Sequence, residues 1–421
     1  MMKVAVIGGG ISGLCTSYYL IKAGVQVELY EPHKPTREND KEVPFGASYV
    51  NAGYLTPSHI IPLSSPSLFA SGFKMMFQRK SPFYIKPRLS TNLMKWGLNF
   101  AKYSNNKHVD YAIPEIAQIN LYSKALFQEI LSSNEIGDFQ YRDRGLLMMY
   151  KTKEVGEEEL EVSHRATEFG IKSEQLNHEA LKKIEPNIHA SVMGAVRYYS
   201  DVSTNPIEFM SKMWTYLMAH KNFSLVEHKV TAIDLNGTEV KLHTDSGEGH
   251  SYDKVAITTG AQANHLLKSA GDSILLEAGK GYAIQTSKSD HIKFPALLLE
   301  SKVAVSPFED RIRFSGTMEL SGINHNINNL RVSAIAESAE QYYQGLSIAD
   351  FKLQEARCGL RPLSPDGLPY IGASKDPRVV VNTGGAMMGW SIGPAAGKMT
   401  TAVLVEQKSE ISLSPFALNR F

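Results

Sequence analysis

The sequence predicts an α/β protein with two domains, a Rossmann-like dinucleotide-binding domain and an α+β domain built on a mainly antiparallel sheet. Two glycine-rich turns, one near each end of the 421-residue chain, stand between a buried strand and a helix. The blocks between them lack a phosphate-binding motif and contain several strand patterns. Each domain should therefore be assembled from discontinuous segments, with residues 1–56, 194–265 and 353–421 in the dinucleotide-binding domain and residues 57–193 and 266–352 in the substrate-binding domain.

The N-terminal unit reads KVAVIGGGISGLCTSYYLIKAGVQVELYE. An apolar strand leads into the spacing G-x-G-x-x-G, a helix follows, and a second strand ends at Glu31, where a carboxylate can accept a hydrogen bond from a ribose 2′-OH. The first glycine permits a tight turn, the second lets backbone N–H groups approach a pyrophosphate, and the third lets the helix pack on the sheet. The expected cofactor contacts here are Gly8, Gly10, Ile11, Ser12, Gly13 and Glu31. This unit alone does not decide between NAD and FAD, and a glycine-rich turn without a ligand is the plainer alternative.

The composition excludes several classes of protein. Lys and Arg number 44 against 43 Asp and Glu, so no global field attracts nucleic acid. The two cysteines, Cys15 and Cys358, are too few for a disulfide framework or a cysteine-rich metal site, and no metal site is expected. No run of about 18 apolar residues predicts a membrane span, and the first residues already form a strand, unlike a signal peptide. A cytoplasmic protein is expected, either soluble or bound peripherally to a membrane.

Two further segments rich in small residues suit a backbone that lies directly against a ligand. The first is GASYVNAGYLTPS, which follows a polar loop over Pro32 to Pro44; an ordinary loop is its alternative. The second is the end of a strand over Lys254 to Thr258, while the main chain of an earlier strand can meet an adenine edge. The expected contacts in these segments are Ser48, Asn51, Ala52, Gly53, Val230, Thr259 and Gly260.

The stretch from Leu68 to Pro87 reads LFASGFKMMFQRKSPFYIKP and combines apolar residues with cations. It fits an amphipathic surface that rests on a membrane. It fits equally a set of core residues with a solvated basic rim. The membrane reading requires binding to anionic vesicles that is lost when Lys74, Arg79 and Lys80 are neutralised.

The remaining blocks contain regular patterns. Apolar periodicity predicts helices over Thr91–Tyr103, Pro114–Leu131 and Glu154–Phe169, and a strand within Gly145–Thr152. The later block contains strand patterns in GYAIQTS, LLLESKVAVSPF and RIRFSGTMEL, which predict the mainly antiparallel sheet.

The C-terminal stretch decides between the two cofactors. A short strand at Val379–Val381 leads into a glycine turn and a helix expected over Gly389–Val405. FAD gives a reason for this second helix N-terminus, because the isoalloxazine lies far from the adenine and its anionic reduced form is stabilised by a helix dipole. The expected contacts are Gly385, Met388, Gly389 and Trp390, although Met388 and Trp390 fit helix packing as well.

The chain resembles the FAD-dependent amine and amino-acid oxidoreductases that include D-amino-acid oxidase, glycine oxidase and sarcosine oxidase, with bacterial D-amino-acid dehydrogenases most similar. The resemblance covers nearly all residues and is carried by the N-terminal fingerprint and by SYVNAGYLTP, FQRKSPFYIKP, KGYAIQ, RIRFSGTMELSG, GLRPLSPDGLPYIG and NTGGAMMGW. It implies a GR2-type FAD-binding domain with non-covalent FAD. It also implies that Arg361 pairs with the substrate carboxylate, with Tyr282 and Tyr54 as further pocket residues.

The implied reaction is oxidation of a small amino acid, either a D-amino acid or a proline-like one. Hydride would pass from Cα to flavin N5, the imine would hydrolyse to a 2-oxo acid and ammonia, and a quinone-type acceptor at the membrane would take the electrons. An oxygen-using oxidase of glycine, sarcosine or another secondary amine is the alternative. Gly385 and Ala386 stand where the resembled dehydrogenases usually carry His-Gly, and Cys358 lies one position from the site of covalent flavin attachment in sarcosine oxidases. An ordinary ion pair is the plainer role for Arg361, and core packing the plainer role for Tyr282 and Tyr54.

Overall fold

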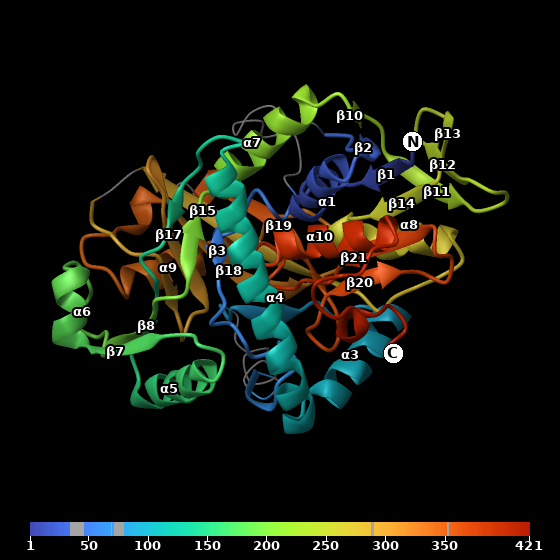
Figure 1. Ribbon diagram of the computed structural model, residues 1–421. Helices are drawn as coiled ribbons and strands as arrows, with labels where there is room; N and C mark the ends of the chain where they lie inside the picture. Colours follow the sequence, from blue (N-terminus) through green and yellow to red (C-terminus); the bar gives the residue numbers. More distant parts are fainter. Residues whose placement is uncertain (34–45, 69, 71–79, 288–289, 352) are drawn as a thin grey trace.

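The structure is a computed structural model that describes residues 1–33, 46–68, 70, 80–287, 290–351 and 353–421. Two large sheets organise the described chain. In Figure 1 the six-stranded sheet lies toward the right and the nine-stranded sheet toward the left, with the long helix α4 (Asn106–Ser133) drawn across the middle. The expected stretch from Pro32 to Pro44 lies mostly outside the described residues, as does half of Leu68 to Pro87.

The six-stranded sheet is built from segments at both ends and the middle of the sequence. Its order is β10 (Phe223–Val226), β2 (Gln26–Tyr30), β1 (Lys3–Ile7), β14 (Lys254–Ile257), β21 (Val379–Thr383) and β20 (Tyr370–Ala373). All neighbours are parallel except β20 and β21. The strands are almost continuously apolar because both faces of a parallel sheet are covered.

Helices cover one face of this sheet and a small antiparallel sheet covers the other. The helical face consists of α1 (Ile11–Lys22), α7 (Pro206–Ala219), α10 (Gly393–Leu404) and part of α4. A Cβ at Gly397 would lie 2.7 Å from the Cys15 backbone, so α1 and α10 pack closely although they come from opposite ends of the chain. The other face carries β11 (Val230–Asp234), β12 (Val240–Thr244), β13 (Gly249–Tyr252) and α8 (Ala263–Ser269).

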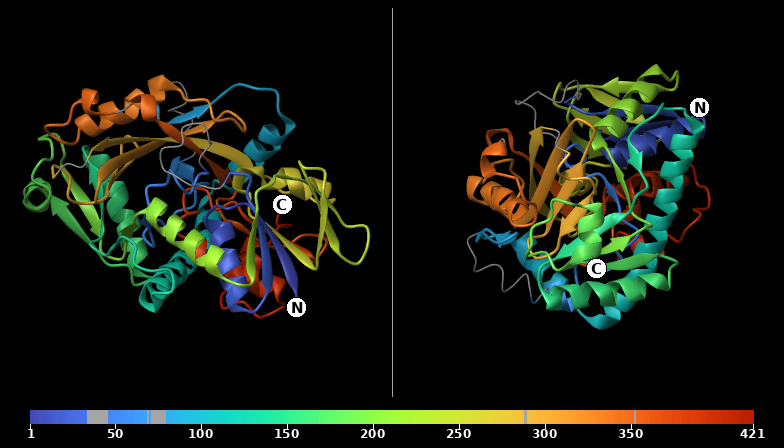
Figure 2. Two further views of the ribbon diagram at one scale, coloured as in Figure 1. Left: turned by 90° about the horizontal axis from the view of Figure 1, so that it is seen from above. Right: turned by 90° about the vertical axis from the view of Figure 1, so that its left-hand side faces the viewer.

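The second large sheet is mainly antiparallel, as expected. Its order is β19 (Arg357–Leu363), β15 (Glu277–Ser287), β18 (Arg311–Leu320), β17 (Val303–Pro307), β16 (Ala296–Leu298), β6 (Leu146–Tyr150), β8 (Gly194–Tyr198) and β7 (Ser173–Asn177), and β4 (Phe83–Ile85) pairs with β18. Figure 2 (left) shows α9 (Asn329–Glu340) lying on one face of this sheet. The remaining described elements include α3 (Thr91–Tyr103), α5 (Lys153–Thr167), α6 (His178–Ile184) and a sheet of β3 (Tyr54–Leu55), β9 (Val202–Thr204) and β5 (Tyr141–Arg142).

The structure corrects three of the expected limits. The strands β8 and β19 pair within the nine-stranded sheet, although the expected boundaries grouped residues 194–265 and 353–421 with the dinucleotide-binding domain. Helix α4 continues through Pro114 and begins at Asn106, where the Asn105 side chain accepts a hydrogen bond from the His108 N–H. Helix α10 begins at Gly393, four residues after the expected Gly389.

Candidate active site

A large cavity of about 1780 Å³ lies between the two large sheets. Pockets for one drug-sized ligand typically measure roughly 300–1,000 Å³, so this cavity has room for an extended ligand and a small second molecule. The predicted site residues that line it are Gly8, Gly10, Ile11, Ser12, Glu31, Ser48, Asn51, Ala52, Tyr54, Val230, Thr259, Gly260, Tyr282, Arg361, Met388, Gly389 and Trp390. Gly13, Gly53 and Gly385 do not line it.

The first glycine turn is fixed by contacts between backbone groups. Gly8 has φ +108°, and a Cβ there would lie 2.9 Å from the Thr258 carbonyl oxygen. A Cβ at Gly13 would lie only 1.8 Å from the Gly8 carbonyl oxygen, so this glycine permits the turn and the helix to touch. The Thr258 hydroxyl donates toward the Ile7 and Gly8 carbonyl oxygens at 2.8 and 3.0 Å. Thr258 is a supporting residue that the sequence interpretation did not single out.

Two side chains complete the dinucleotide end. The Ile11 N–H at the start of α1 donates to the Ser48 hydroxyl at 3.0 Å, which brings the second glycine-rich segment to the helix N-terminus. The Glu31 carboxylate accepts from the Gly9 N–H at 2.8 Å and from the His33 N–H at 3.2 Å. Burial raises the pKa of Glu31 although both backbone donors act to lower it. Its position at the end of β2 matches the expected site of a ribose contact.

The segment over residues 49–53 is tied to the nine-stranded sheet by Arg313, which sequence reasoning missed. The Arg313 Nη1 donates to the Tyr49 carbonyl oxygen at 3.0 Å and to the Asn51 carbonyl oxygen at 2.7 Å. Gly53 has φ +79° and a Cβ there would lie 2.0 Å from the Thr204 carbonyl oxygen. Gly53 is therefore required for the contact between β3 and β9, while Asn51 and Ala52 face the cavity.

The C-terminal turn differs from the expected helix start. Residues 386–390 form turns that line the cavity, and the first turn of α10 comes only after them. Gly389 is therefore not at a helix N-terminus. Met388 and Trp390 are largely buried, and the Trp390 indole N–H donates to the Thr204 hydroxyl at 3.0 Å. Both side chains pack in the core as well as contacting the cavity.

Strand β14 also leads to this cavity. Thr259 and Gly260 follow this strand, and the Gly260 carbonyl oxygen accepts from the Thr383 hydroxyl at 2.9 Å. The hydroxyls of Thr259 and Ser315 are buried and have no partner among the described residues, although both residues line the cavity. Unpaired buried hydroxyls cost free energy unless a ligand or water satisfies them, so they fit a polar ligand in this space.

Arg361 lies at the other end of the cavity, on β19. Its guanidinium lies across Gly281 of β15, because a Cβ at Gly281 would lie 2.3 Å from Arg361 Nη1. Nη1 donates to the Thr317 carbonyl oxygen at 2.8 Å, and Thr317 has the unusual φ of +72°. In the described part of the chain no carboxylate forms an ion pair with Arg361. Burial lowers the pKa of Arg361 to about 10, so the guanidinium remains charged at neutral pH.

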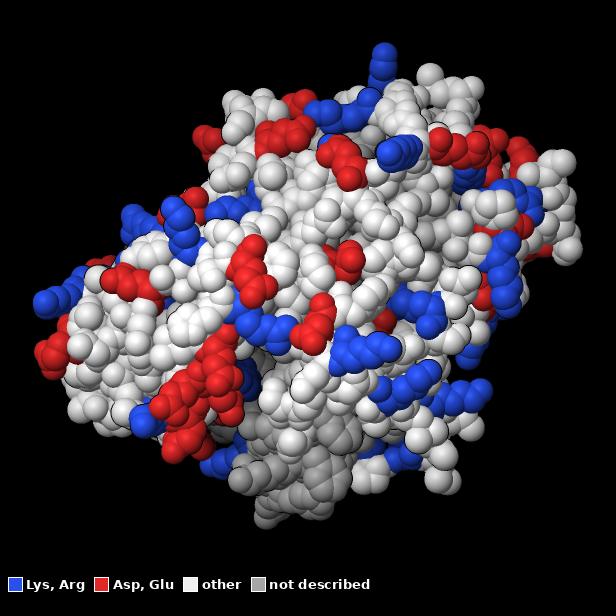
Figure 3. Space-filling model, turned by 60° about the horizontal axis from the view of Figure 1, so that its bottom comes forward, with Lys and Arg blue, Asp and Glu red and all other residues white. Residues whose placement is uncertain are grey.

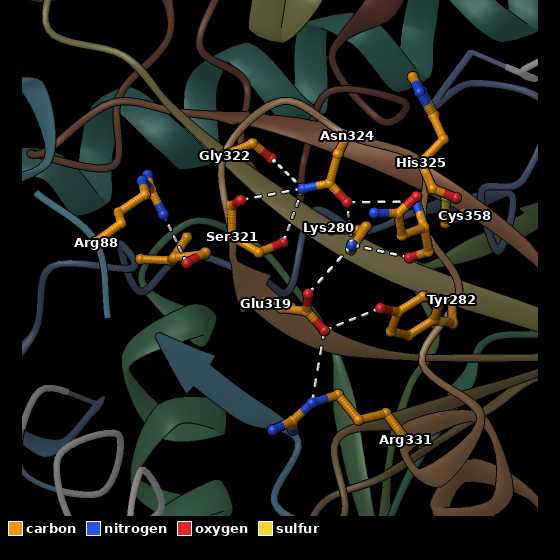
Figure 4. A network of polar contacts seen from close by, with 12 residues as sticks. Arg88, Lys280, Tyr282, Glu319, Ser321, Gly322, Asn324, His325, Arg331 and Cys358 are labelled. Carbon is orange, nitrogen blue, oxygen red and sulfur yellow. Dashed lines mark hydrogen bonds and ion pairs between the residues drawn. The ribbon is translucent and has the colours of Figure 1, made fainter. Parts of the chain in front are cut away.

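Tyr282 belongs to a buried polar network beside Arg361 (Figure 4). Its hydroxyl donates to Glu319 at 2.9 Å, and Glu319 also lies 3.1 Å from the Lys280 ammonium and 3.5 Å from Arg331 Nε. Burial acts to raise the pKa of Glu319, but hydrogen bonds from Ser321, Tyr282 and Lys280 bring it below its ordinary value. The network holds the Tyr282 ring on the face of β15 that packs against α9, opposite the face where Gly281 meets Arg361, and its single hydroxyl proton is already engaged by Glu319.

Tyr54 reaches the same region from β3. Its ring contacts the cavity, but its hydroxyl lies 2.5 Å from the Val305 carbonyl oxygen and 3.1 Å from that of Ala296. These contacts join the small sheet of β3 to the nine-stranded sheet. The structure therefore brings all three expected pocket residues to one cavity and gives each a different set of partners.

Comparisons with known proteins agree with this arrangement. A family model described as DAO, FAD dependent oxidoreductase, matches residues 3–403. The D-amino acid dehydrogenases of Allorhizobium ampelinum and Vibrio vulnificus are each 26% identical over 435 residues, which span 100% of this chain and 99% of each relative. Among solved structures, glycine oxidase from Geobacillus kaustophilus has a TM-score of 0.77 at 19% identity and covers 100% of both chains. L-Proline dehydrogenase from P. horikoshii has a TM-score of 0.73 at 16% identity, covering 100% of this chain and 97% of that one.

These findings confirm the two-domain α/β architecture and the FAD-dependent oxidoreductase activity expected from the sequence. The cavity fits the cofactor of this family, because one end offers a glycine turn at a helix N-terminus and the middle offers unpaired buried hydroxyls. Since the family model covers residues 3–403, the chain belongs to the DAO family of FAD-dependent oxidoreductases.

Proposed function

We propose that this protein oxidises an amino acid at its Cα–N bond, as a D-amino-acid dehydrogenase does. The observation that carries the proposal is the half-buried Arg361 guanidinium, which borders the cavity, is partly desolvated and has no ion-pair partner among the described residues. A buried charge is costly unless it is paired, and a planar guanidinium matches a carboxylate through two parallel hydrogen bonds. A substrate carboxylate supplies the missing partner.

The protein's own residues would bind and orient the substrate. Thr317 and Gly281 hold the Arg361 guanidinium in place, and the network around Glu319 supports β15 from its opposite face through Tyr282. FAD, when bound, supplies the acceptor for the hydride that leaves Cα. The resulting imine would hydrolyse to a 2-oxo acid and ammonia. Positioning, rather than a general base, would supply most of the rate enhancement.

We further propose which residues hold FAD. The turn at Gly8 and Gly10 and the start of α1 would receive the pyrophosphate, and Glu31 would accept from a ribose hydroxyl. The main chain at Val230 would meet the adenine. The segment over residues 51–52 and the turn over residues 386–390 would border the isoalloxazine, with no covalent bond to Cys358, whose thiol donates instead to the His325 carbonyl oxygen at 3.4 Å.

The direct test is anaerobic incubation of the purified yellow protein with single D- and L-amino acids, including proline and hydroxyproline. We expect loss of the visible flavin absorbance with at least one amino acid and release of the matching 2-oxo acid or cyclic imine. A flavin that stays oxidised with every amino acid would refute the proposal. Peroxide formed in air would favour the oxidase alternative over a dehydrogenase.

We propose a membrane quinone as electron acceptor, supported by the two faces of α3. Trp96, Gly97 and Phe100 line the cavity, while Met94 and Leu98 on the other face are 65% and 72% exposed. Basic side chains gather at the lower right of the face in Figure 3, while both signs are mixed over the rest of this face. Lys95 and Lys102 of α3 are exposed. An exposed apolar face with cations beside it is typical of a surface that rests on anionic lipid.

Lys80, one of the cations named from the sequence, forms an ion pair with Glu337 at 2.6 Å, and Lys74 and Arg79 lie outside the described residues. The sharper test therefore uses the combined variant Met94→Ser and Leu98→Ser. We expect reduced co-sedimentation with vesicles of anionic lipid and unchanged flavin reduction by amino acid. Equal sedimentation of variant and parent would exclude this surface. Among the described residues, no helix is both long and apolar enough to span a bilayer.

A further inference from the structure

An apolar cluster forms the end of the cavity that lies next to Arg361. Trp96 is 4% exposed and its ring stacks on Phe100 with centroids 4.9 Å apart. The Trp96 indole N–H donates to the Leu363 carbonyl oxygen at 2.8 Å, which fixes α3 against β19. We call this set the α3 pocket, and its other members that line the cavity are Leu63, Phe83, Ile85, Met318, Leu320 and Ala386.

The α3 pocket and the Arg361 guanidinium lie over the same face of β15. A Cβ at Gly279 would lie 2.4 Å from Met318 Sδ and 2.7 Å from Leu363 Cδ1, while a Cβ at Gly281 would lie 2.3 Å from Arg361 Nη1. Residues two apart on a strand face the same side, roughly 7 Å apart. A carboxylate bound to Arg361 therefore leaves the substituent on its α-carbon within reach of Met318 and Leu363.

The α3 pocket is uncharged. Arg88, labelled on the left of Figure 4, forms an ion pair with Glu277 at 2.5 Å, and neither residue lines the cavity. Both partners are already engaged, because Arg88 also donates to the Leu320 carbonyl oxygen and Glu277 also accepts from Asn92. A charged substrate side chain would meet no partner here and would lose its hydration.

Gly97 leaves an open space in this wall. It follows Trp96 on α3 and lines the cavity, and a Cβ added there would meet no heavy atom within 4 Å among the described residues. Glycine disfavours a helix interior relative to alanine, so the local helix gives no reason for it. The missing side chain widens the α3 pocket.

Resting on the proposed function, we propose that the substrate is an α-amino acid with a bulky, uncharged apolar side chain, branched, cyclic or aromatic, and that Gly97 determines this specificity. The side chain packs in the α3 pocket while its carboxylate pairs with Arg361. Glycine, alanine and sarcosine leave the pocket unfilled, and acidic or basic amino acids place a charge in it.

The test is a size series, Gly97→Ala and Gly97→Leu, with Asn99→Leu as a size-matched control, because Asn99 lies on the same helix but does not line the cavity. Anaerobic stopped-flow reduction of the flavin is measured with amino acids of increasing side-chain size and both configurations. We expect the parent's flavin to be reduced at least about tenfold faster by bulky apolar amino acids than by alanine. Gly97→Leu should lower this ratio of reduction rates by about 10- to 200-fold. Asn99→Leu should keep the parent's ratio.

A binding measurement separates this inference from turnover. Calorimetric titration of the FAD-loaded protein with phenylacetate and with acetate compares one carboxylate with and without an apolar group. We expect tighter binding of phenylacetate to the parent, and loss of that advantage in Gly97→Leu. The inference is wrong if the parent favours glycine or alanine, or if Gly97→Leu slows flavin reduction by all amino acids equally. It is also wrong if Gly97→Leu slows only reoxidation of the flavin by a quinone, because the pocket would then be the acceptor site. A parent whose flavin no amino acid reduces would instead refute the proposed function.

Discussion

The two ends of the cavity are built in different ways. At the dinucleotide end, glycines bring backbone groups together, as where the Gly13 Cα approaches the Gly8 carbonyl oxygen. At the Arg361 end, side chains from β18, β19 and α3 form the surface over two glycines of β15. Binding of a cofactor common to a whole family depends mainly on backbone contacts, whereas a particular substrate needs particular side chains. Changes at the first end should therefore affect mainly cofactor binding and folding, and changes at the second should affect mainly substrate binding.

The largest effect is expected at the dinucleotide end, from Gly13→Val. The added Cβ would lie 1.8 Å from the Gly8 carbonyl oxygen and 2.7 Å from the Thr258 hydroxyl, and neither backbone segment can move without opening the sheet. We expect a loss of at least about 3 kcal/mol in stability and little or no bound flavin. Thermal unfolding and the ratio of flavin absorbance to protein absorbance measure both effects. Gly24→Ala is a control, since a Cβ there meets no heavy atom within 4 Å, although its φ of +78° adds some strain. A Gly13→Val protein that retained FAD would contradict the role of backbone packing.

At the other end, Arg361→Met should separate function from stability. Loss of the guanidinium should lower kcat/KM roughly 10²- to 10³-fold, because a substrate carboxylate would be left without its buried partner. The same change removes an unpaired buried charge whose pKa is already lowered to about 10, so the free protein should unfold at an equal or higher temperature. Arg361→Lys keeps the charge but loses the planar fork, so its kcat/KM should lie between that of the parent and that of Arg361→Met.

Flavin content of the Arg361 variants serves as the internal control. A normal flavin-to-protein ratio with slow anaerobic reduction supports a role in substrate binding. If Arg361→Met instead lost its flavin, the guanidinium would belong to the cofactor end and the contrast between the two ends would fail. Reduction of the variant at the parent's rate would remove Arg361 from the site altogether.

The same contrast explains how far the sequence could predict this site. Glycine spacing identifies Gly8, Gly10 and Gly13 because backbone approach needs residues without a side chain at fixed local separations. Arg361 was found only through a resemblance, since the space for its guanidinium is created by Gly281, 80 positions earlier on a neighbouring strand. Local patterns do not determine which strands pair, so the α3 pocket could not be predicted.

The predicted limits of helices and the missed Arg313 have related explanations. Thr91–Tyr103 was predicted with its observed limits because Ser90 caps a strongly amphipathic helix. The start of α10 was placed four residues early because no side chain caps its N-terminus, so no capping residue in the sequence marks where the turn over residues 389–392 ends. Arg313 was missed because its partners are carbonyl oxygens of residues 49 and 51, which leave no trace in the sequence.

The buried carboxyl group of Asp201 should make the stability of the protein depend on pH, whereas contacts between backbone groups should not. Burial raises the pKa of Asp201 from 3.8 to about 7, against hydrogen bonds from Ser58 and the charge of Lys124, while Glu159 acts to raise it further. The protonated acid is favoured in the folded state, so its cost to stability is absent below about pH 4, grows as the pH rises, and is complete above about pH 7. Asp201→Asn should remove up to about 4 kcal/mol of this decline.

Urea unfolding between pH 4 and pH 8 measures this decline in the parent and in Asp201→Asn. A shallower slope is expected in the variant, with part of the slope remaining because the pKa of Glu159 is also raised to about 7 by burial. Identical slopes in both proteins would show that Asp201 titrates as an ordinary exposed carboxylate. The glycine turn, which relies on backbone contacts, should keep its flavin across the same range.

The smallest effect is expected from Tyr54→Phe, which tests how sharply the two ends differ. The Tyr54 ring contacts the cavity, but its hydroxyl is engaged by the Val305 and Ala296 carbonyl oxygens on the nine-stranded sheet. Removing that hydroxyl should cost about 1 kcal/mol of stability and leave kcat/KM within about twofold of the parent. A fall of about tenfold or more in kcat/KM at unchanged stability would mean that the hydroxyl turns toward the substrate when FAD is bound. In that case side chains of the small β3 sheet would also belong to the substrate end.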